Sequence, residues 1–390
     1  MQTRTSPKKV LITFARSFLA LAISRHFADA GYEVFVADSI NRHVSKYSKA
    51  VKKTFVLPSP RFESKLYIQK LIEIINREKI NFLIPVYEET SYISKAIHLF
   101  PKDCKIFAPS FDLYHDLQNK WLFQKKLDLL GIETLKFKLI KNHEDLVNNG
   151  FNTPFALKPC YSRASQKIQK IDPNESKEIN IPMDIHNPWI AQEWAAGKKY
   201  CSYSICHGGK IYGHAIYPVN YAIDGNSCLT FQAIEHDPIF EWIAKFVSKI
   251  NYTGQIAFDF IESEDKKLFA IECNPRATSG LLLFNEKDRL SEAFLKVNHT
   301  YIKPKIGTKR QIAMGMLVYG WRKKAKPNNS LHQFIKDFFS IKDVIFKAND
   351  LKPFLFKPLV FISIWAKSRE LGLKIPSYFT HDHDWNGEPF

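Results

Sequence analysis

The chain has 390 residues, of which 45% are hydrophobic and 24% charged, a composition typical of a soluble globular protein with two or three domains. Its formal net charge of +17 favours an anionic ligand such as a nucleotide, phosphate, nucleic acid or an acidic membrane surface, although lysines spread over solvated helix faces would give the same sum. The six cysteines are scattered without a CxxC pair, and neither a signal peptide nor an apolar run of about 20 residues is evident. These features disfavour a disulfide framework, a zinc site and a membrane span, and we expect a cytoplasmic protein.

The first 117 residues alternate short β-rich runs with helical spacing. A strand at Lys9–Phe14, a helix at Ser17–Ala30 and a strand at Glu33–Ala37 make one βαβ unit, which predicts a parallel sheet. The turn after the first strand, TFARS, lacks the glycines of GxGxxG, so a Rossmann-like domain without bound NAD is expected. The same alternation predicts four further elements: helix Ser64–Glu78, strand Asn81–Pro85, helix Ser91–Leu99 and strand Lys105–Ala108.

The pattern changes after residue 117. The next predicted elements are helix Lys120–Leu130, strand Phe155–Lys158, a polar excursion at Asp172–Asn187, strand Trp189–Trp194, a hairpin of Cys201–Cys206 with Lys210–Ala215, and helix Pro238–Ile250. Beyond Pro304 the chain is rich in Phe, Lys and Pro, and helices are expected at Leu331–Phe339 and Leu359–Leu371.

Two β-rich runs, Gln255–Ile261 and Leu268–Cys273, flank a charged turn and predict a hairpin. If the hairpin is centred on the middle of that turn, Asp259 lies directly opposite Glu272, with their Cβ atoms about 5 Å apart. Side chains alternate along a strand, so Asn274 projects on the same face as Glu272. This face therefore presents two carboxylates and a carboxamide side by side.

The other face of the hairpin is predicted to be apolar, with Phe258 opposite Cys273 and Phe260 opposite Ile271. Facing carboxylates repel each other, and a divalent cation removes that penalty. Mg²⁺ characteristically takes one or two carboxylates and keeps positions for substrate phosphates. An exposed acidic hairpin is the alternative, but Arg276 follows at once and offers a guanidinium that can grip phosphoryl oxygens.

From Asn119 to Leu283 the chain resembles the ATP-grasp superfamily, especially its carboxylate–amine ligases and carbamoyl-phosphate-synthase-like members. The resemblance rests on NKWLFQKKLDLLGI, FALKP, WIAQEWAAG and, most specifically, FDFIE followed by FAIECNPRATSG. It implies an α/β protein with a Rossmann-like pre-ATP-grasp domain at residues 1–117. A two-lobed α+β ATP-grasp domain would follow at 118–303, with its lid at about 155–195, and a small C-terminal helical region at 304–390.

The same resemblance implies three groups of site residues. The phosphates and adenine of ATP would be bound by Lys120, Lys158, Gln192, Glu193, Trp194 and Ala195. Magnesium ions, with Mn²⁺ as an alternative, would be bound by Asp259, Glu272 and Asn274. Arg276 would face the γ-phosphate or the acyl phosphate as a catalytic residue. Apart from the resemblance, the loop after Lys158 offers Ser162 and Ser165 as further phosphate ligands and Arg163 as a second catalytic residue.

Two features depart from the family pattern. The loop after Lys158 reads CYSRASQ and lacks the glycines that let backbone amides approach phosphates, so hydroxyls and Arg163 are expected to take their place. Gly197 is followed by Lys198 and Lys199, where the family often has a glutamate that binds ribose. Recognition of the ribose therefore stays open.

Three other polar groups have structural explanations. THDHDW at residues 380–385 contains metal-ligand types, but alternation on an extended segment separates the histidines from the aspartates, which favours a docked or solvated tail. Glu235 and His236 precede a helix and are expected to cap it. Glu88 and Glu89 follow a strand of the parallel sheet, at the edge where such sheets bind ligands, and also begin a helix, where acids are stabilised by the dipole.

The sequence thus predicts an ATP- and Mg²⁺-dependent ligase that activates a small carboxylate as an acyl phosphate and joins it to an amine. The alternative is a degenerate ATP-grasp scaffold that acts as a basic nucleotide- or nucleic-acid-binding protein, motivated by the +17 charge and the glycine-free loop. The expected partners are small-molecule carboxylate and amine substrates. Nucleic acid is disfavoured, and a homodimer is an open option.

Overall fold

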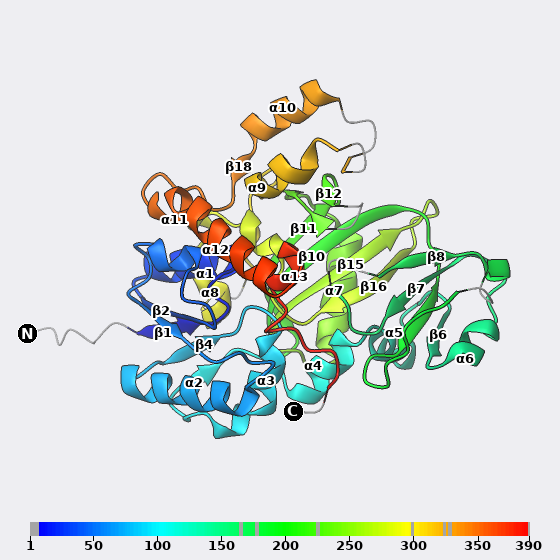
Figure 1. The fold of residues 1–390 in the computed structure, drawn as a ribbon, viewed down its shortest axis with the longest axis horizontal. Helices are drawn as coiled ribbons and strands as arrows, with labels where there is room; N and C mark the ends of the chain where they lie inside the picture. Colours follow the sequence, from blue (N-terminus) through cyan, green and yellow to red (C-terminus); the bar gives the residue numbers. More distant parts are fainter. Residues whose placement is uncertain are drawn as a thin grey trace, which may run out of the picture.

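The computed structural model describes residues 8–163, 167–175, 179–223, 227–297, 300–322, 325–326 and 330–388. It is a mixed α/β structure in which a parallel sheet precedes antiparallel sheets and a C-terminal group of helices, as the sequence predicts (Figure 1). Within the described ranges, no helix is both long enough and apolar enough to cross a membrane.

The N-terminal part contains a five-stranded parallel sheet with the order β3-β2-β1-β4-β5. Its strands are β1 (Lys9–Ile12), β2 (Glu33–Asp38), β3 (Lys53–Val56), β4 (Phe82–Ile84) and β5 (Lys105–Ile106). Its helices are α1 (Phe18–Asp29), α2 (Ser64–Glu78), α3 (Glu89–Lys95) and α4 (Phe111–Gln118). The bounds of α2 match the predicted ones, whereas α3 begins two residues earlier than predicted and ends at Lys95. Neither β3 nor α4 was predicted.

The order of this sheet reverses between β1 and β4, because the chain builds outward first on one side of β1 and then on the other. Parallel sheets bind ligands outside the carboxyl ends of their strands at such a switch point. The segment after β1 carries Arg16, and the segment after β4 carries Glu88. Both residues therefore lie at the edge that faces the rest of the molecule.

Two antiparallel sheets follow, with the orders β6-β9-β7-β8 and β11-β10-β15-β16. The first contains β6 (Phe137–Ile140), β7 (Phe155–Pro159), β8 (Gln169–Ile171) and β9 (Trp189–Glu193). The second contains β10 (Lys198–His207), β11 (Lys210–Pro218), β15 (Gly254–Glu262) and β16 (Leu268–Asn274). The helices of this region are α5 (Lys120–Leu129), α6 (His143–Val147) and α7 (Asp237–Lys249). One face of the second sheet packs on α5 and α7 through buried aromatic rings of Phe123, Phe246 and Phe258. Tyr203 and Tyr217 of the same sheet are buried in a core that it shares with the N-terminal part.

The predicted hairpin forms, and its register is confirmed in one half only. Asp259 pairs with Glu272, and Phe258 pairs with Cys273. Phe260 pairs with Ala270 rather than with Ile271, because the register shifts at a β-bulge. A bulge places two residues of one strand opposite one residue of its partner and re-aims their side chains. As a result, Ile271 and Glu272 both line the same cavity instead of pointing to opposite faces.

The remaining elements connect these sheets and form the C-terminal region. They are β12 (Ala222–Ile223), β13 (Ser227–Cys228), β14 (Thr230–Gln232), α8 (Ser291–Leu295), β17 (Lys309–Gln311), α9 (Ala313–Gly315), α10 (Leu331–Ser340), β18 (Lys342–Asp343), α11 (Lys352–Leu355), α12 (Lys357–Glu370) and α13 (Ile375–Tyr378). In Figure 1, α11 to α13 lie against the N-terminal part, and the last segment of the chain runs back towards α4. An ion pair between Arg25 of α1 and Asp350, together with buried contacts of Leu21 with Val360 and Ile364, fixes that packing.

Candidate functional site

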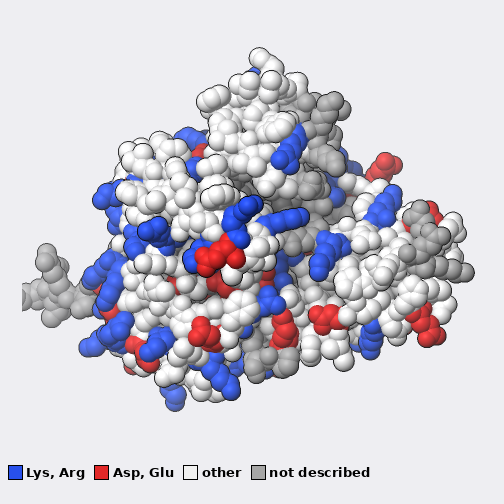
Figure 2. All heavy atoms as spheres, in the orientation of Figure 1, with Lys and Arg blue, Asp and Glu red and all other residues white. Residues whose placement is uncertain are grey.

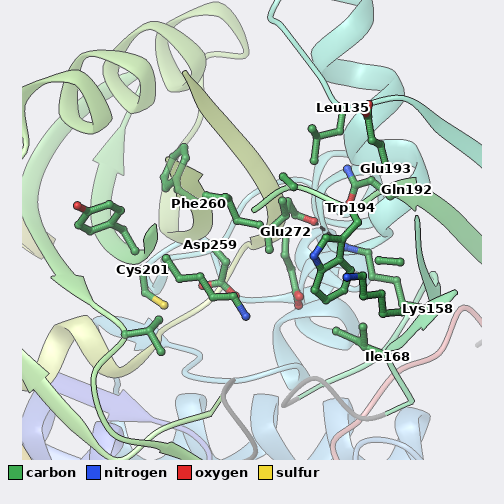
Figure 3. Close-up of a pocket in the computed structure, with 18 residues that line it drawn as sticks. Leu135, Lys158, Ile168, Gln192, Glu193, Trp194, Cys201, Asp259, Phe260 and Glu272 are labelled. Carbon is green, nitrogen blue, oxygen red and sulfur yellow. Dashed lines mark hydrogen bonds between the residues drawn. The ribbon is translucent and has the colours of Figure 1, made fainter. Parts of the chain in front are cut away.

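A cavity of about 200 Å³ lies between the two antiparallel sheets (Figure 3). Its walls combine residues of β7, β8 and β9 on one side with residues of β10, β15 and β16 on the other. Among the predicted site residues, those that line it are Lys158, Gln192, Glu193, Trp194, Ala195, Asp259 and Glu272. Residues that are separated by more than 100 positions in the sequence thus meet at one place.

Two lysines approach the paired carboxylates from different elements. Lys158 lies in β7, is 4% exposed, and donates a hydrogen bond from Nζ to the carbonyl oxygen of Ile271 at 3.2 Å. Lys120 is the first residue of α5, is 2% exposed, and places Nζ 3.3 Å from Oε1 of Glu272. The pKa of Lys158 is lowered to about 8, chiefly by burial. The carboxylates of Glu272 and Asp259 raise this pKa, whereas the charge of Lys120 lowers it. Two buried ammonium groups beside each other favour an anion.

Asp259 and Glu272 form the acidic side of the cavity, and Figure 3 shows both side chains directed into it. Burial and, second to it, the adjacent charge of Glu272 raise the pKa of Asp259 to about 6. Within the described ranges, no group of three or more His, Cys, Asp and Glu side chains could hold a metal ion. A cation bound here would take its remaining ligands from amide, phosphate or water oxygens.

Asn274 and Arg276 lie beyond the carboxylate pair, at the end of β16. Nη2 of Arg276 donates to Oδ1 of Asn274 at 2.9 Å, and the guanidinium lies 4.5 Å from the centre of the Tyr87 ring. Nε of Arg276 is buried without a hydrogen-bond partner among the described residues, and it lies 3.7 Å from Oε1 of Glu88. Neither Asn274 nor Arg276 lines the cavity, so these two predicted residues belong to an adjoining polar cluster.

The predicted adenine strand lies on the opposite wall. Gln192 is 2% exposed, and its Nε2 has no hydrogen-bond partner among the described residues although it borders the cavity. The ring of Trp194 is 39% exposed, with Nζ of Lys170 at 5.1 Å from its centroid, and Lys199 also lines the cavity. Glu193 anchors the strand, since its backbone amide donates to the carbonyl of Lys136 at 2.8 Å. This wall offers an aromatic face and an unsatisfied amide, which suit a planar heterocycle.

Arg163 does not point into the cavity. Its guanidinium donates from Nε to Oε1 of Glu88 at 2.8 Å and from Nη2 to Oε2 of the same carboxylate. It also lies 3.2 Å from Asp384 and donates to Asn386. Its role as a phosphate ligand stays a prediction, and it requires these contacts to be exchanged for the ligand.

The same loop contains the two predicted serines, Ser162 and Ser165. Ser162 is described, and its carbonyl oxygen accepts a hydrogen bond from Nζ of Lys120 at 3.0 Å. Its hydroxyl points to the carbonyl of Pro159 at 3.5 Å. Ser165 lies outside the described residues.

Sequence reasoning undervalued Glu88, which is fully buried at the switch point of the parallel sheet. Besides Arg163 it accepts hydrogen bonds from Nε2 of Gln118 at 3.1 Å and from the backbone amide of Trp385 at 3.1 Å. Burial raises its pKa, but the charges of Arg163 and Arg276 outweigh that effect and leave the pKa lowered. The sequence signal for a functional role of Glu88 was its position at the carboxyl end of β4. Acidic residues are also stabilised at the start of a helix, so the same position had a structural explanation.

The C-terminal segment at residues 380–388 also belongs to this cluster. Asp382 forms an ion pair with Arg16 at 2.9 Å, and the 4% exposed ring of Trp385 packs on Phe111 and Tyr161. The expectation of a docked or solvated tail is thus confirmed in its docked form. The docked segment touches both the N-terminal part, through Arg16, and the loop after β7, through Tyr161.

A nucleotide with a hard divalent cation fits this arrangement. The amide of Gln192, which has no hydrogen-bond partner among the described residues, suits a base. The two buried lysines suit phosphates, and the facing carboxylates suit a cation. Nε of Arg276, in the adjoining polar cluster, also makes no hydrogen bond within the described part of the chain.

Comparison with known proteins gives the same picture. Residues 117–280 match the family model of the ATP-grasp domain. No curated protein sequence matches the chain at a significant level.

Three solved structures illustrate the likeness in fold. N5-carboxyaminoimidazole synthetase from Staphylococcus aureus is 13% identical with a TM-score of 0.59, over 77% of this chain and 80% of that chain. L-amino acid ligase from Bacillus licheniformis is 13% identical with a TM-score of 0.56, over 74% of each chain. The biotin carboxylase domain of 2-oxoglutarate carboxylase from Hydrogenobacter thermophilus, described with MgADP and bicarbonate, is 13% identical with a TM-score of 0.60, over 77% of this chain and 72% of that chain.

The matched segment spans α5, both antiparallel sheets and the hairpin that carries Asp259 and Glu272, and it contains the residues that line the cavity. Residues 117–280 of this chain therefore match the ATP-grasp domain family.

Proposed function

We propose that this protein is an ATP- and Mg²⁺-dependent ligase that joins a small carboxylate to an amine. The single observation that supports this best is that Lys158, Asp259 and Glu272 line one cavity whose opposite wall carries Gln192, while Lys120 forms an ion pair with Glu272. Two buried lysines beside a pair of facing carboxylates serve little structural purpose in a hairpin. They serve the binding of a phosphate chain and its metal ion well.

The proposed reaction has two steps. A carboxylate oxygen attacks the γ-phosphorus of ATP, which gives an acyl phosphate and ADP. An amine then attacks the acyl carbon, phosphate leaves, and the amine loses a proton as the amide forms. The protein contributes positioning and charge neutralisation to both steps, which are the main sources of catalysis in phosphoryl transfer.

Lys120 and Lys158 would hold the phosphate chain, because their ammonium groups are buried and fixed by hydrogen bonds to Ser162 and Ile271. Fixed donors cost no reorganisation when negative charge develops. Trp194 and Gln192 would hold the adenine from the other wall. The phosphates are then placed beside Asp259 and Glu272.

Asp259 and Glu272 would hold magnesium, and Asn274 would join them if Arg276 released its amide oxygen. Bound there, the metal would neutralise phosphate charge, as Mg²⁺ does when it bridges a carboxylate and phosphate oxygens. The raised pKa of Asp259 supports this assignment, since a nearby cation would restore its ionised form. Mn²⁺ takes the same oxygen ligands.

Arg276 would hold the substrate carboxylate or the acyl phosphate. It lies between the metal-binding end of β16 and Glu88, and its buried Nε lacks a hydrogen-bond partner among the described residues. Arg163 would reach the phosphates only after leaving Glu88 and Asp384. We therefore propose that Arg276 contacts the substrate carboxylate or acyl phosphate first. Arg163 would contact the phosphates later, after it leaves Glu88 and Asp384.

Structures with the same fold support the reaction class. One of them is N5-carboxyaminoimidazole synthetase, another is L-amino acid ligase, and a third, a biotin carboxylase domain, is a dimer with MgADP and bicarbonate. A homodimer is likewise a proposal, and sedimentation of the purified chain would test it.

The alternative, a basic scaffold that binds nucleotide or nucleic acid without catalysis, is less consistent with the site. Such a scaffold needs cations, whereas Asp259 and Glu272 repel a polyanion unless a metal ion lies between them. Salt separates the two cases. Binding to a nucleic-acid backbone weakens steeply with salt, whereas a closed Mg-nucleotide site responds much less.

The proposal is tested by ADP release with Mg-ATP and a panel of small carboxylates and amines, including amino acids. Addition of the right pair should stimulate ADP release and yield an amide that mass spectrometry identifies. The double variant Asp259→Asn/Glu272→Gln should lose this activity, whereas Glu264→Gln/Asp265→Asn in the exposed turn of the same hairpin should retain it. Equal ADP release by the first variant and the wild type would sink the site assignment.

A further inference from the structure

Exposed bulky apolar side chains gather in one part of the chain. Of the 26 large hydrophobic residues that are exposed among the described ones, 14 lie between residues 317 and 371. That stretch is one seventh of the sequence, so the enrichment is several-fold. A concentration of exposed apolar side chains marks an interaction site more often than scattered single residues do. We call the exposed residues of this stretch the C-terminal surface.

α10 contributes a stripe to the C-terminal surface. Leu331, Ile335 and Phe339 are spaced by four residues and are 68%, 47% and 82% exposed. Residues at this spacing share one face of a helix. Phe334, which is buried in a cluster with Met316, lies beside this stripe, three residues after Leu331. α10 therefore has one apolar arc that is covered along one edge and open along the rest.

α12 shows the same arrangement. Val360 and Ile364 are buried against α1 and its neighbours, whereas Leu359, Ile362 and Trp365 are 42%, 58% and 50% exposed. A helix that is apolar all round is normally buried on every side. Here one side is open, so the sequence of α12 is better suited to a second apolar environment than to water.

The charge around these stripes is strongly positive. Residues 317–371 contain eleven Lys and Arg and only four Asp and Glu. Lys336 in α10, Lys352 in α11 and Arg369 in α12 are exposed next to the apolar positions. Figure 2 shows a largely uncharged surface over α9 and α10, with blue side chains below it and along the neighbouring edge.

We propose that the C-terminal surface binds the face of an acidic lipid bilayer. Helices with Trp, Phe and Leu on one face and Lys or Arg beside them lie in the interface of anionic membranes, where the apolar face enters the acyl boundary and the cations contact headgroups. A second copy of this chain would bring a rim of the same sign against this one, which opposes self-association through the surface. Charge complementarity therefore selects the lipid surface. The proposal is independent of the nucleotide site, because none of these residues lines the cavity.

The test uses the full chain and vesicles of two compositions, phosphatidylcholine alone and phosphatidylcholine with phosphatidylglycerol. In a sedimentation assay, we expect the protein to associate with the anionic vesicles at least tenfold more tightly than with the neutral ones. Raising the salt concentration should weaken the association, because headgroup attraction is screened. Absence of binding to anionic vesicles at low salt would overturn the proposal.

Variants distinguish this surface from general basicity. Phe339→Ser/Ile362→Ser should reduce association with anionic vesicles at least tenfold, whereas Leu129→Ser, at a position 82% exposed on α5, should not. Lys336→Gln/Lys352→Gln should reduce it as well, against Lys102→Gln on the N-terminal part as the matched control. Circular dichroism shows whether each variant is folded. If the Phe339→Ser/Ile362→Ser variant is unfolded, the test rests on the Lys336→Gln/Lys352→Gln variant, which removes no packing. Equal loss in controls and surface variants would contradict the proposal, as would a dimer of the wild type that the Phe339/Ile362 variant abolishes.

Discussion

Glu88 and Arg163 form a buried ion pair with two contacts, in which Nε and Nη2 of the guanidinium each donate to a different carboxylate oxygen. Glu88 follows β4 of the parallel sheet, and Arg163 follows β7 of the sheet that carries the predicted lid. The pair therefore ties the loop after β7 to the N-terminal part. The backbone amide of Trp385 completes the set of donors to Glu88.

The first prediction concerns this pair. Glu88→Gln leaves Arg163 and Arg276 buried without their carboxylate, and loss of one partner of a buried pair costs about 3–5 kcal/mol of unfolding free energy. Urea denaturation measures this loss. Glu33→Gln is the control, because its pair with Lys52 lies at the surface, and we expect it to change stability by less than about 1 kcal/mol.

The same pair predicts a pH dependence. The pKa of Glu88 is lowered in the folded protein, so its contribution to stability is present above the unfolded value of about 4.3 and is lost as the pH falls through the folded value. The difference in unfolding free energy between wild type and Glu88→Gln should therefore shrink below about pH 4. A difference that stays constant down to pH 3 would show that the carboxylate's charge is not responsible.

The second prediction concerns Asp259 in the absence of metal. Its pKa of about 6 lies above the ordinary 3.8, so the folded state favours the protonated form. The stability it contributes is full below the ordinary value and is lost as the pH rises through about 6. With a chelator present, the unfolding free energy of Asp259→Asn minus that of the wild type should increase as the pH rises from 4 to 7. The expected increase is on the order of 2 kcal/mol.

Thermal or urea unfolding at pH 4 and at pH 7 measures this change in unfolding free energy, with Asp265→Asn in the exposed turn as the control. Addition of magnesium and nucleotide should remove the advantage of Asp259→Asn, because a bound cation favours the carboxylate. A variant advantage that grows on adding magnesium would contradict the metal assignment.

The third prediction concerns Lys158. Lys158→Met should reduce ADP release by about 100-fold or more, because one fixed donor to developing phosphate charge is worth roughly that factor. Lys138→Met, at the partly exposed β6, should leave the rate within about twofold of wild type, since it makes no contact with the cavity.

The pKa of Lys158 adds a binding test. Since this pKa is about 8 in the free protein, the charged form that attracts phosphate is lost above pH 8. The Kd for ATP should rise there in the wild type and stay flatter in Lys158→Met. Isothermal titration between pH 7 and pH 9.5 measures both, and parallel pH profiles would argue against a phosphate contact of Lys158.

The fourth prediction compares two tryptophans. Trp385 is 4% exposed and Trp365 is 50% exposed. Trp385→Ala should cost about 3–5 kcal/mol of unfolding free energy and should increase proteolytic cleavage within residues 155–195, because the C-terminal segment no longer holds Tyr161. Trp365→Ala should change stability by less than about 1 kcal/mol. Unchanged cleavage in a destabilised Trp385→Ala protein would show that the segment does not fasten this lobe.

Much of the fold could be predicted because its signals are local. The helix over Ser64–Glu78 has the predicted bounds, and Ser17 caps α1 by accepting a hydrogen bond from the amide of Leu19. By contrast, β3 was missed because only Phe55 of its four residues is buried, so that it lacks a clear apolar alternation. The domain boundaries stay predictions.

The candidate site shows the same division. Asp259 and Glu272 lie on adjacent strands joined by a short turn, so spacing alone predicted their pairing. Spacing could not predict the β-bulge beside this pair. A bulge places one extra residue in one strand, and whether it forms depends on how both faces of the sheet pack. It decides that Ile271 and Glu272 share the cavity wall.

By itself, the sequence determined the order of elements, the acidic hairpin and the two lysines, since each depends on residues close together in the chain. Only the tertiary structure decided that Arg163 binds Glu88, that Trp385 covers both, and that α12 leaves one apolar face open. Glu88 and Trp385 are 297 positions apart. Contacts at such separations follow from which buried surfaces fit together, and no local periodicity or turn signal encodes that fit.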